Sequence, residues 1–218
     1  MASYLAHWKS LKLMSLKSER ELMKKQYPGP VNESYFTERK PTSGFQLLDR
    51  VDLKDKLVLD LGAFGGYVGW HCAKRGARPV LIDLFSSAMP DYWPRVEGDK
   101  ERLPFKDETF DLVACNDTLH HGGLVQTGGE VARVLRSGGI FISTREPQRA
   151  SWESEDDVLR KDCAVELASG INERRPCLKE YQEFCRRFRS SLIFACHDMS
   201  PAKDLNYGGD GIAIWCHR

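Results

Sequence analysis

A glycine-rich turn with acidic residues on both sides is the first segment of this sequence that could do chemistry. Residues 60–67 read DLGAFGGY, and Asp83 follows Asp60 by 23 residues. Glycines such as Gly62 and Gly66 let the backbone approach a ligand closely and adopt turns that are closed to other residues. A carboxylate in the position of Asp83 can accept hydrogen bonds from both hydroxyls of a ribose. The turn and the acid together indicate a ligand that contains a nucleoside.

The spacing of the glycines argues against a dinucleotide. A G-x-G-x-x-G motif that began at Gly62 would need glycines where Phe64 and Tyr67 stand, so a diphosphate would be poorly seated. Alternatively, the glycine turn has no ligand and only reverses the chain. The acidic residue at the end of each adjoining strand argues against this alternative.

Seven short segments are expected to form the sheet that positions these residues. The predicted strands are 56–61, 79–84, 95–97, 110–116, 140–144, 191–196 and 211–216, with helices over 67–75, 130–136, 155–169 and 178–188. The alternation predicts an α/β fold: a Rossmann-like, seven-stranded, mostly parallel sheet with helices on both faces and a C-terminal antiparallel strand pair. Residues 1–45 are expected to form an N-terminal helical lid, and residues 46–218 the main domain.

Composition restricts the class of protein. The chain has 218 residues, 41% hydrophobic and 29% charged, with a net charge of +1, which is ordinary for one folded domain. With neither an apolar span nor a signal peptide, a cytoplasmic location is expected. Seven cysteines without a C-x-x-C pair predict neither disulfides nor a metal site. Residues 1–40 hold eight basic and four acidic side chains, which is more typical of an amphipathic helix than of a nucleic-acid-binding arm.

A longer set of motifs carries a resemblance. These are 98–105 (GDKERLPF), 110–113 (FDLV), 119–121 (LHH), Glu130, 133–135 (RVL) and the glycines 138–139. Their order and spacing resemble class I S-adenosylmethionine-dependent methyltransferases, in the small-molecule branch that includes enzymes of ubiquinone and menaquinone biosynthesis, from about residue 57 to 144. The resemblance implies methyl transfer from S-adenosyl-L-methionine, with S-adenosyl-L-homocysteine as product, to an oxygen or nitrogen of a small metabolite or natural product.

The same resemblance implies a set of cofactor-binding residues. Asp60 would hold the amino group, Asp83 the ribose hydroxyls, and Asp99 the adenine amino group, with Leu84 packed on the adenine. The full set is Asp60, Gly62, Ala63, Gly66, Asp83, Leu84, Asp99, Lys100 and Asn116. One departure stands out, because the family alternates glycines as D-x-G-x-G-x-G and Phe64 takes the middle position here.

Two adjacent histidines are the candidates for acid–base chemistry. An alcohol acceptor keeps its proton at neutral pH, and a histidine placed beside it can remove that proton. His120 and His121 follow the fourth predicted strand, and Glu146, just past the fifth, is a candidate orienting carboxylate. Loop histidines with a structural role explain the pair equally well. An RNA or protein methyltransferase, or a non-catalytic cofactor-binding subunit, therefore stays open beside the small-molecule enzyme, and the oligomeric state is left open too.

Overall fold

The computed structural model describes residues 45–168, 173–196 and 211–218, and nine positions before them (20, 21, 24, 25, 29–31, 34 and 36). Most of the predicted N-terminal lid lies outside the described residues. Phe36 is described and stacks on Trp70, with ring centroids 5.5 Å apart.

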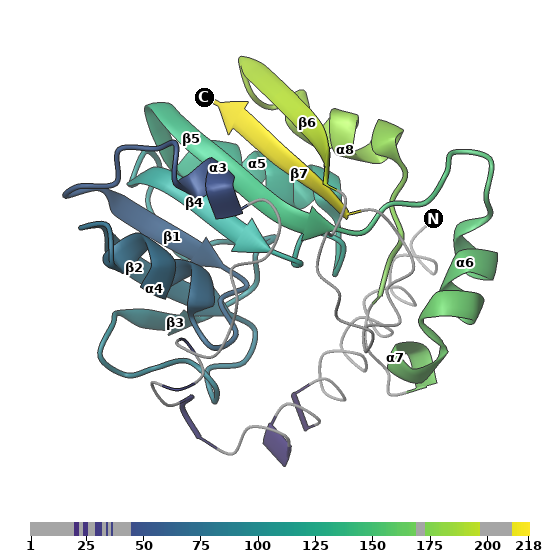
Figure 1. The fold of residues 1–218 in the computed structure, drawn as a ribbon, viewed down its shortest axis with the longest axis horizontal. Helices are drawn as coiled ribbons and strands as arrows, with labels where there is room; N and C mark the ends of the chain where they lie inside the picture. Colours follow the sequence, from purple (N-terminus) through teal and green to yellow (C-terminus); the bar gives the residue numbers. More distant parts are fainter. Residues whose placement is uncertain are drawn as a thin grey trace, which may run out of the picture.

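Seven strands form one sheet, as the sequence predicts. They are β1 (Leu57–Leu61), β2 (Arg78–Asp83), β3 (Arg95–Glu97), β4 (Phe110–Asn116), β5 (Leu135–Glu146), β6 (Ser190–Cys196) and β7 (Gly211–His217). Their order is β3-β2-β1-β4-β5-β7-β6. The first five strands pair in parallel, and β7 runs antiparallel to both β5 and β6 (Figure 1). The Rossmann-like fold and the closing antiparallel pair are thus confirmed.

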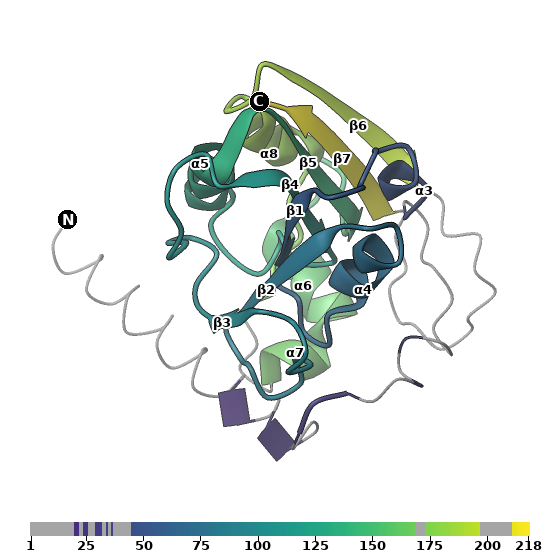
Figure 2. The same ribbon diagram turned by 90° about the vertical axis from the view of Figure 1, so that its left-hand side faces the viewer.

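Helices cover both faces of the sheet. The described helices are α3 (Phe45–Leu48), α4 (Tyr67–Ala73), α5 (Leu124–Val134), α6 (Glu155–Asp162), α7 (Ala164–Ala168) and α8 (Leu178–Cys185). The core on one face joins α5 and α8 to the central strands, and the core on the other joins α3 and α4. Figure 2 shows the two helix layers on opposite sides of the strands. The central strands are apolar along nearly their whole length because both of their faces are buried.

Helix α5 starts earlier than the sequence indicates. The predicted segment was 130–136, whereas α5 spans Leu124–Val134 and contains the pair Gly128 and Gly129. Glycines weaken a helix, which is why the pattern suggested a later start. Gly128 faces α8, where a Cβ would lie 3.1 Å from the ring of Phe184, so the small residue lets the two helices pack closely.

Two other elements differ from the prediction. The single helix expected over 155–169 is interrupted at Cys163, which is fully buried and has φ −131°. Strand β5 begins at Leu135 and therefore includes the glycines that were expected to separate helix from strand. The expected boundary between lid and main domain falls within α3, where Phe45 is buried in the core.

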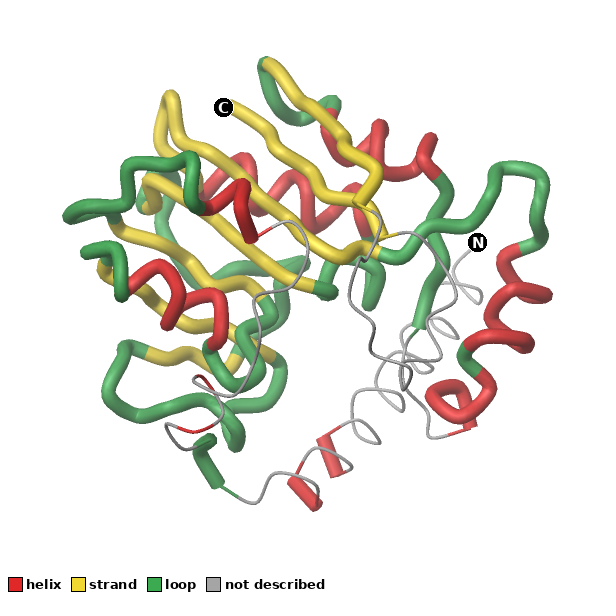
Figure 3. The backbone as a smooth tube through the Cα atoms, viewed as in Figure 1, coloured by secondary structure: helices red, strands yellow, loops and turns green. Residues whose placement is uncertain are grey.

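The carboxyl ends of the parallel strands β1 to β5 meet at one edge of the sheet, because parallel strands share a direction. Figure 3 shows the loops that follow these strands gathered at this edge, with α6 and α7 beyond it. Open α/β sheets bind ligands at such an edge. Within the described part of the chain, no helix has the length and apolar character needed to cross a membrane.

Candidate functional site

The glycine-rich turn after β1 is fastened to the end of β2. The N–H groups of Gly62 and Ala63 donate to the carbonyl of Ile82 at 2.9 and 3.0 Å, and the N–H of Phe64 donates to Asp83 Oδ2 at 2.8 Å. Gly62, Phe64 and Gly66 all have positive φ, at 68°, 47° and 77°. The turn therefore keeps a left-handed residue where the family pattern has its middle glycine, at a cost of about 1–2 kcal/mol for Phe64.

Gly62 is the position in this turn that tolerates a side chain least. A Cβ there would lie 2.2 Å from Thr118 Cγ2, in a left-handed backbone. We expect Gly62→Ala to lower the free energy of unfolding by about 3 kcal/mol, from overpacking and backbone strain together. Urea unfolding followed by circular dichroism measures it. The control is Gly129→Ala, at an exposed helical position with no atom within 4 Å of the new Cβ. That substitution should be neutral or stabilising, and equal stability of the two variants would contradict the prediction.

Asp83 ends β2 and is shared between two backbone segments. Its Oδ2 accepts from Phe64 and its Oδ1 accepts from the N–H of Phe85 at 3.1 Å. Burial raises the pKa of Asp83, and the two backbone donors oppose that shift. Each carboxylate oxygen has a second lone pair, so the group can still accept hydrogen bonds from a ligand. Leu84, the next residue, is half-buried.

Asp60, at the end of β1, is deeply buried, with 1% of its surface exposed. Its Oδ2 accepts the N–H of Gly69 in α4 at 2.7 Å. Burial raises the pKa of Asp60 from 3.8 to about 7, the Gly69 hydrogen bond lowers it, and the negative charge of Asp83 raises it further. A buried acid poised near neutrality beside a glycine turn suits a cationic group.

Three further predicted residues lie in the neighbouring loops. Asp99 Oδ1 caps the turn after β3 by accepting the N–H of Glu101 at 2.9 Å. Lys100 Nζ donates to the carbonyl of His121 at 2.9 Å, and burial lowers its pKa. Asn116 Oδ1 accepts from the hydroxyl of Thr144 on β5 at 2.9 Å. The structure thus places these residues at one edge, with the β3 and β4 loops joined by Lys100.

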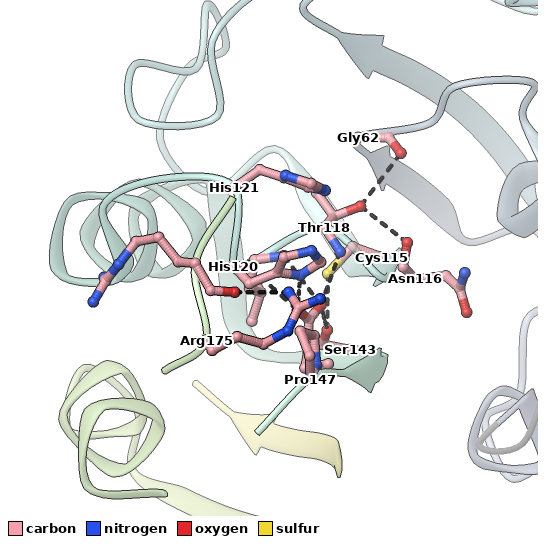
Figure 4. A network of polar contacts seen from close by, with 12 residues as sticks. Gly62, Cys115, Asn116, Thr118, His120, His121, Ser143, Pro147 and Arg175 are labelled. Carbon is pink, nitrogen blue, oxygen red and sulfur yellow. Dashed lines mark hydrogen bonds and ion pairs between the residues drawn. The ribbon is translucent and has the colours of Figure 1, made fainter. Parts of the chain in front are cut away.

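Glu146, the last residue of β5, organises the loop after β4. It is fully buried, and its oxygens accept the backbone N–H groups of residues 118, 119 and 120 at 3.1–3.3 Å. The hydroxyl of Ser143 also donates to it at 2.6 Å. Burial raises the pKa of Glu146, but the contacts with His120 and the donors outweigh it, so the pKa lies below its usual range. Figure 4 shows this network around His120, Ser143 and Arg175.

His120 is held between two carboxylates. Its side chain is 2% exposed, with Nδ1 3.1 Å from Glu146 Oε2 and Nε2 3.5 Å from Glu173 Oε1. Burial lowers the pKa of His120, and the hydrogen bonds and charges of the two glutamates reverse this and raise it to about 9. At neutral pH this imidazole is therefore protonated and enclosed.

His121 occupies the outer side of the same cluster. Its side chain is 37% exposed, and its Nδ1 lies 3.0 Å from Glu173 Oε2. Glu173 also faces Arg175, whose Nη1 donates to Oε1 at 2.6 Å. Burial raises the pKa of Glu173, but the hydrogen bonds and charges of the two imidazoles outweigh it and keep the pKa far below its usual range. Of the two histidines, His121 is the one that a small molecule can reach.

Glu173, Arg175, Thr118 and Ser143 belong to the site, although the sequence pattern did not identify them. Glu173 ends the segment 170–173 (GINE). It lies 52 positions after His121, in a segment without periodicity. Hydrogen bonds of its hydroxyl hold Thr118 in position. The hydroxyl donates to the carbonyl of Asn116 at 3.0 Å and, more weakly, to the carbonyl of Gly62 at 3.5 Å (Figure 4).

Part of the chain matches a known domain family. Residues 59–143 match the family model described as "Methyltransferase domain". The mouse mitochondrial protein named arginine-hydroxylase NDUFAF5 is 30% identical over 167 residues, which are 69% of this chain and 46% of that protein. The chain thus spans less than half the length of this curated relative.

Solved structures share the fold. The Haloferax volcanii methyltransferase in complex with the Trm112 activator has a TM-score of 0.62 and 16% identity, and the match covers 95% of this chain and 96% of that one. Geranyl diphosphate C-methyltransferase from Streptomyces coelicolor, solved with Mg²⁺, geranyl diphosphate and S-adenosyl-L-homocysteine, has a TM-score of 0.63 and 13% identity, with 80% and 78% covered. The chain therefore carries a methyltransferase domain with the fold of the class I, S-adenosylmethionine-dependent enzymes.

Proposed function

We propose that this chain transfers a methyl group from S-adenosyl-L-methionine to an oxygen or nitrogen of a small metabolite. The observation that carries the proposal is the edge where Asp60, Asp83 and the glycine turn adjoin the half-exposed His121. When bound, the sulfonium supplies a methyl group that is already activated. The protein then has to orient the acceptor for in-line attack and remove its proton. The narrower resemblance to quinone-biosynthesis enzymes stays a prediction.

The acids of the edge match the charges and donors of such a cofactor. Asp60, buried and poised near neutrality, suits an ammonium group. Asp83 has lone pairs left after it accepts two backbone N–H groups and suits ribose hydroxyls. Leu84 follows β2 and offers an apolar surface for the adenine, and Asp99 and Lys100 follow the neighbouring strand β3.

Proton removal is assigned to His121, with Glu173 and Glu146 as positioning residues. His121 is accessible, and the carboxylate of Glu173, 3.0 Å from Nδ1, orients its ring. His120 is enclosed and already protonated at neutral pH, so its place is to hold the loop that carries His121.

Calorimetric titration with S-adenosyl-L-homocysteine tests the cofactor pocket. We expect Asp83→Asn to weaken binding about 10- to 100-fold, because charge-assisted hydrogen bonds contribute about 1.5–3 kcal/mol each. The control is Asp55→Asn, before β1 at the opposite edge, where asparagine also tolerates the φ of 59°. Unchanged affinity in Asp83→Asn, or no binding by the wild-type protein, would refute the pocket.

A panel of candidate acceptors with radiolabelled cofactor, in the presence of a chelator, tests the transfer. For an acceptor that is methylated, His121→Asn should lower kcat by about 100-fold or more while the affinity for S-adenosyl-L-homocysteine stays the same. If kcat is unchanged, His121 is not the base.

A macromolecular acceptor is the second candidate. The H. volcanii structure, a complex with a methyltransferase activator, matches nearly the whole chain. The mouse relative is named an arginine-hydroxylase, and an arginine could belong to a protein acceptor. Salt-sensitive retention of RNA, or labelling of a protein in a cell extract, would favour this candidate. Binding of S-adenosyl-L-homocysteine with no methylation of any acceptor would favour a non-catalytic subunit.

A further inference from the structure

Two imidazoles and a carboxylate converge beside the proposed cofactor pocket. One ligand atom from each of His120, His121 and Glu173 lies within 4.8 Å of the other two. We propose that these three side chains bind a first-row divalent transition-metal ion, with Glu146 and Arg175 holding the ligands in place. This inference does not depend on methyl transfer, since it concerns metal binding alone.

The spacing of the donor atoms fits one ion. Nitrogen and oxygen ligands sit about 2.1 Å from such metals, so neighbouring donors are about 3.0 Å apart in octahedral and 3.4 Å apart in tetrahedral geometry. His121 Nδ1 is 3.0 Å from Glu173 Oε2, and His120 Nε2 is 3.5 Å from Glu173 Oε1. The rings of the two histidines are adjacent, with centroids 4.0 Å apart. Small side-chain adjustments are enough to bring the three donors onto a common ion.

The surrounding groups match those that support metal ligands in proteins. Metal-binding histidines usually donate their other ring N–H to a carboxylate, which fixes the tautomer. Glu146 Oε2 lies 3.1 Å from His120 Nδ1, so Nε2 is the nitrogen turned toward Glu173. Ligating carboxylates are themselves hydrogen-bonded, and Arg175 donates to Glu173 Oε1.

One carboxylate oxygen of the cluster has the imidazole of His121 as its neighbour. Among the described residues, Glu173 Oε2 is buried without a well-directed hydrogen bond, and His121 Nδ1 lies 3.0 Å from it. A carboxylate oxygen buried in this way costs free energy unless a cation or donor compensates it. A metal ion shared with Nδ1 would supply that compensation.

The donor types select the metal. Imidazole nitrogens suit Zn²⁺, Fe²⁺ and Co²⁺, whereas Mg²⁺ prefers oxygen ligands alone. Two histidines and one carboxylate leave coordination positions open for water or a substrate oxygen.

Metal titration of the full chain tests the inference. Protein stripped with a chelator is titrated with Co²⁺ and Zn²⁺ by calorimetry, and the visible absorption of Co²⁺ reports its coordination. We expect one ion per chain, no competition from Mg²⁺, and at least tenfold weaker binding in Glu173→Gln and in His121→Asn. The control is His217→Asn. His217 is the last residue of β7 and pairs with Ile140 of β5, at the edge of the sheet opposite the cluster.

The variants keep the test decisive. His121 is half-exposed, so His121→Asn should fold even if Glu173→Gln does not, and thermal unfolding without metal checks each variant. The inference is overturned if the wild type binds neither metal, if His121→Asn binds as tightly as the wild type, or if His217→Asn loses binding equally. Since these readouts need no acceptor, they stay separate from the chelator-treated transfer assay.

Discussion

Replacement of Glu146 by alanine is expected to lower the free energy of unfolding by about 4 kcal/mol, because breaking a buried charge pair costs about 3–5 kcal/mol. The carboxylate accepts three consecutive backbone N–H groups and the Ser143 hydroxyl, and it pairs with His120. Without it, those donors and the charged imidazole stay buried with fewer partners. Urea unfolding at pH 7 measures the loss.

Two further variants separate charge from packing. Glu146→Gln keeps the shape of the side chain but turns an amide NH₂ toward donors, so we expect it to restore less than half of the loss. Glu183→Ala is the matched control, because its carboxylate is 43% exposed and pairs with Arg186 one helical turn away. That change should cost less than about 1 kcal/mol. If Glu146→Ala costs no more than Glu183→Ala, the network does not hold the loop.

Replacement of Asp60 by asparagine should have the opposite effect at alkaline pH. Burial raises the pKa of Asp60 from 3.8 to about 7, so between these pH values the folded protein keeps a proton that the unfolded chain has released. The wild type therefore loses stability as the pH rises through this window, by about 4 kcal/mol for about three pKa units. Asparagine never ionises, and its amide oxygen can still accept the N–H of Gly69.

We expect Asp60→Asn to be more stable than the wild type by about 3 kcal/mol at pH 8, after about 1 kcal/mol is subtracted for burying the amide. At pH 4.5 it should be no more stable. Urea unfolding of both proteins at the two pH values measures the difference in their free energies of unfolding. Groups that titrate alike in both proteins do not contribute to this difference. A stability difference that does not change with pH would show that Asp60 is not perturbed as described.

The same acid predicts proton release when a cationic ligand binds. At pH 7 Asp60 is about half protonated, and an ammonium group placed beside it would favour the carboxylate. Binding of S-adenosyl-L-homocysteine should then release about half a proton, seen as different binding heats in phosphate and Tris buffers. Asp60→Asn should show no such difference, and equal heats for the wild type would place the amino group elsewhere.

The sequence by itself determined the parallel sheet and the edge where the site lies. Runs such as 57–61 and 110–116 are apolar because both faces of those strands are buried, and the turn and acids that follow them need no distant partner to be recognised. These local signals fixed the strand ends that carry Asp60, Asp83 and Asn116, and the motif order identified the methyltransferase domain. The predicted strands are confirmed, and residues 59–143 match a methyltransferase domain model.

Only the tertiary structure decided which side chains meet. Glu146 and Glu173 contact the loop of His120 from 26 and 53 positions away, and Gly128 lies within a helix because Phe184 packs against it. Such contacts depend on how α5, α8 and the loop after β5 pack together. The local periodicity of a sequence predicts secondary structure and does not predict that packing. The pattern therefore could not show that one histidine is enclosed between carboxylates while its neighbour faces solvent.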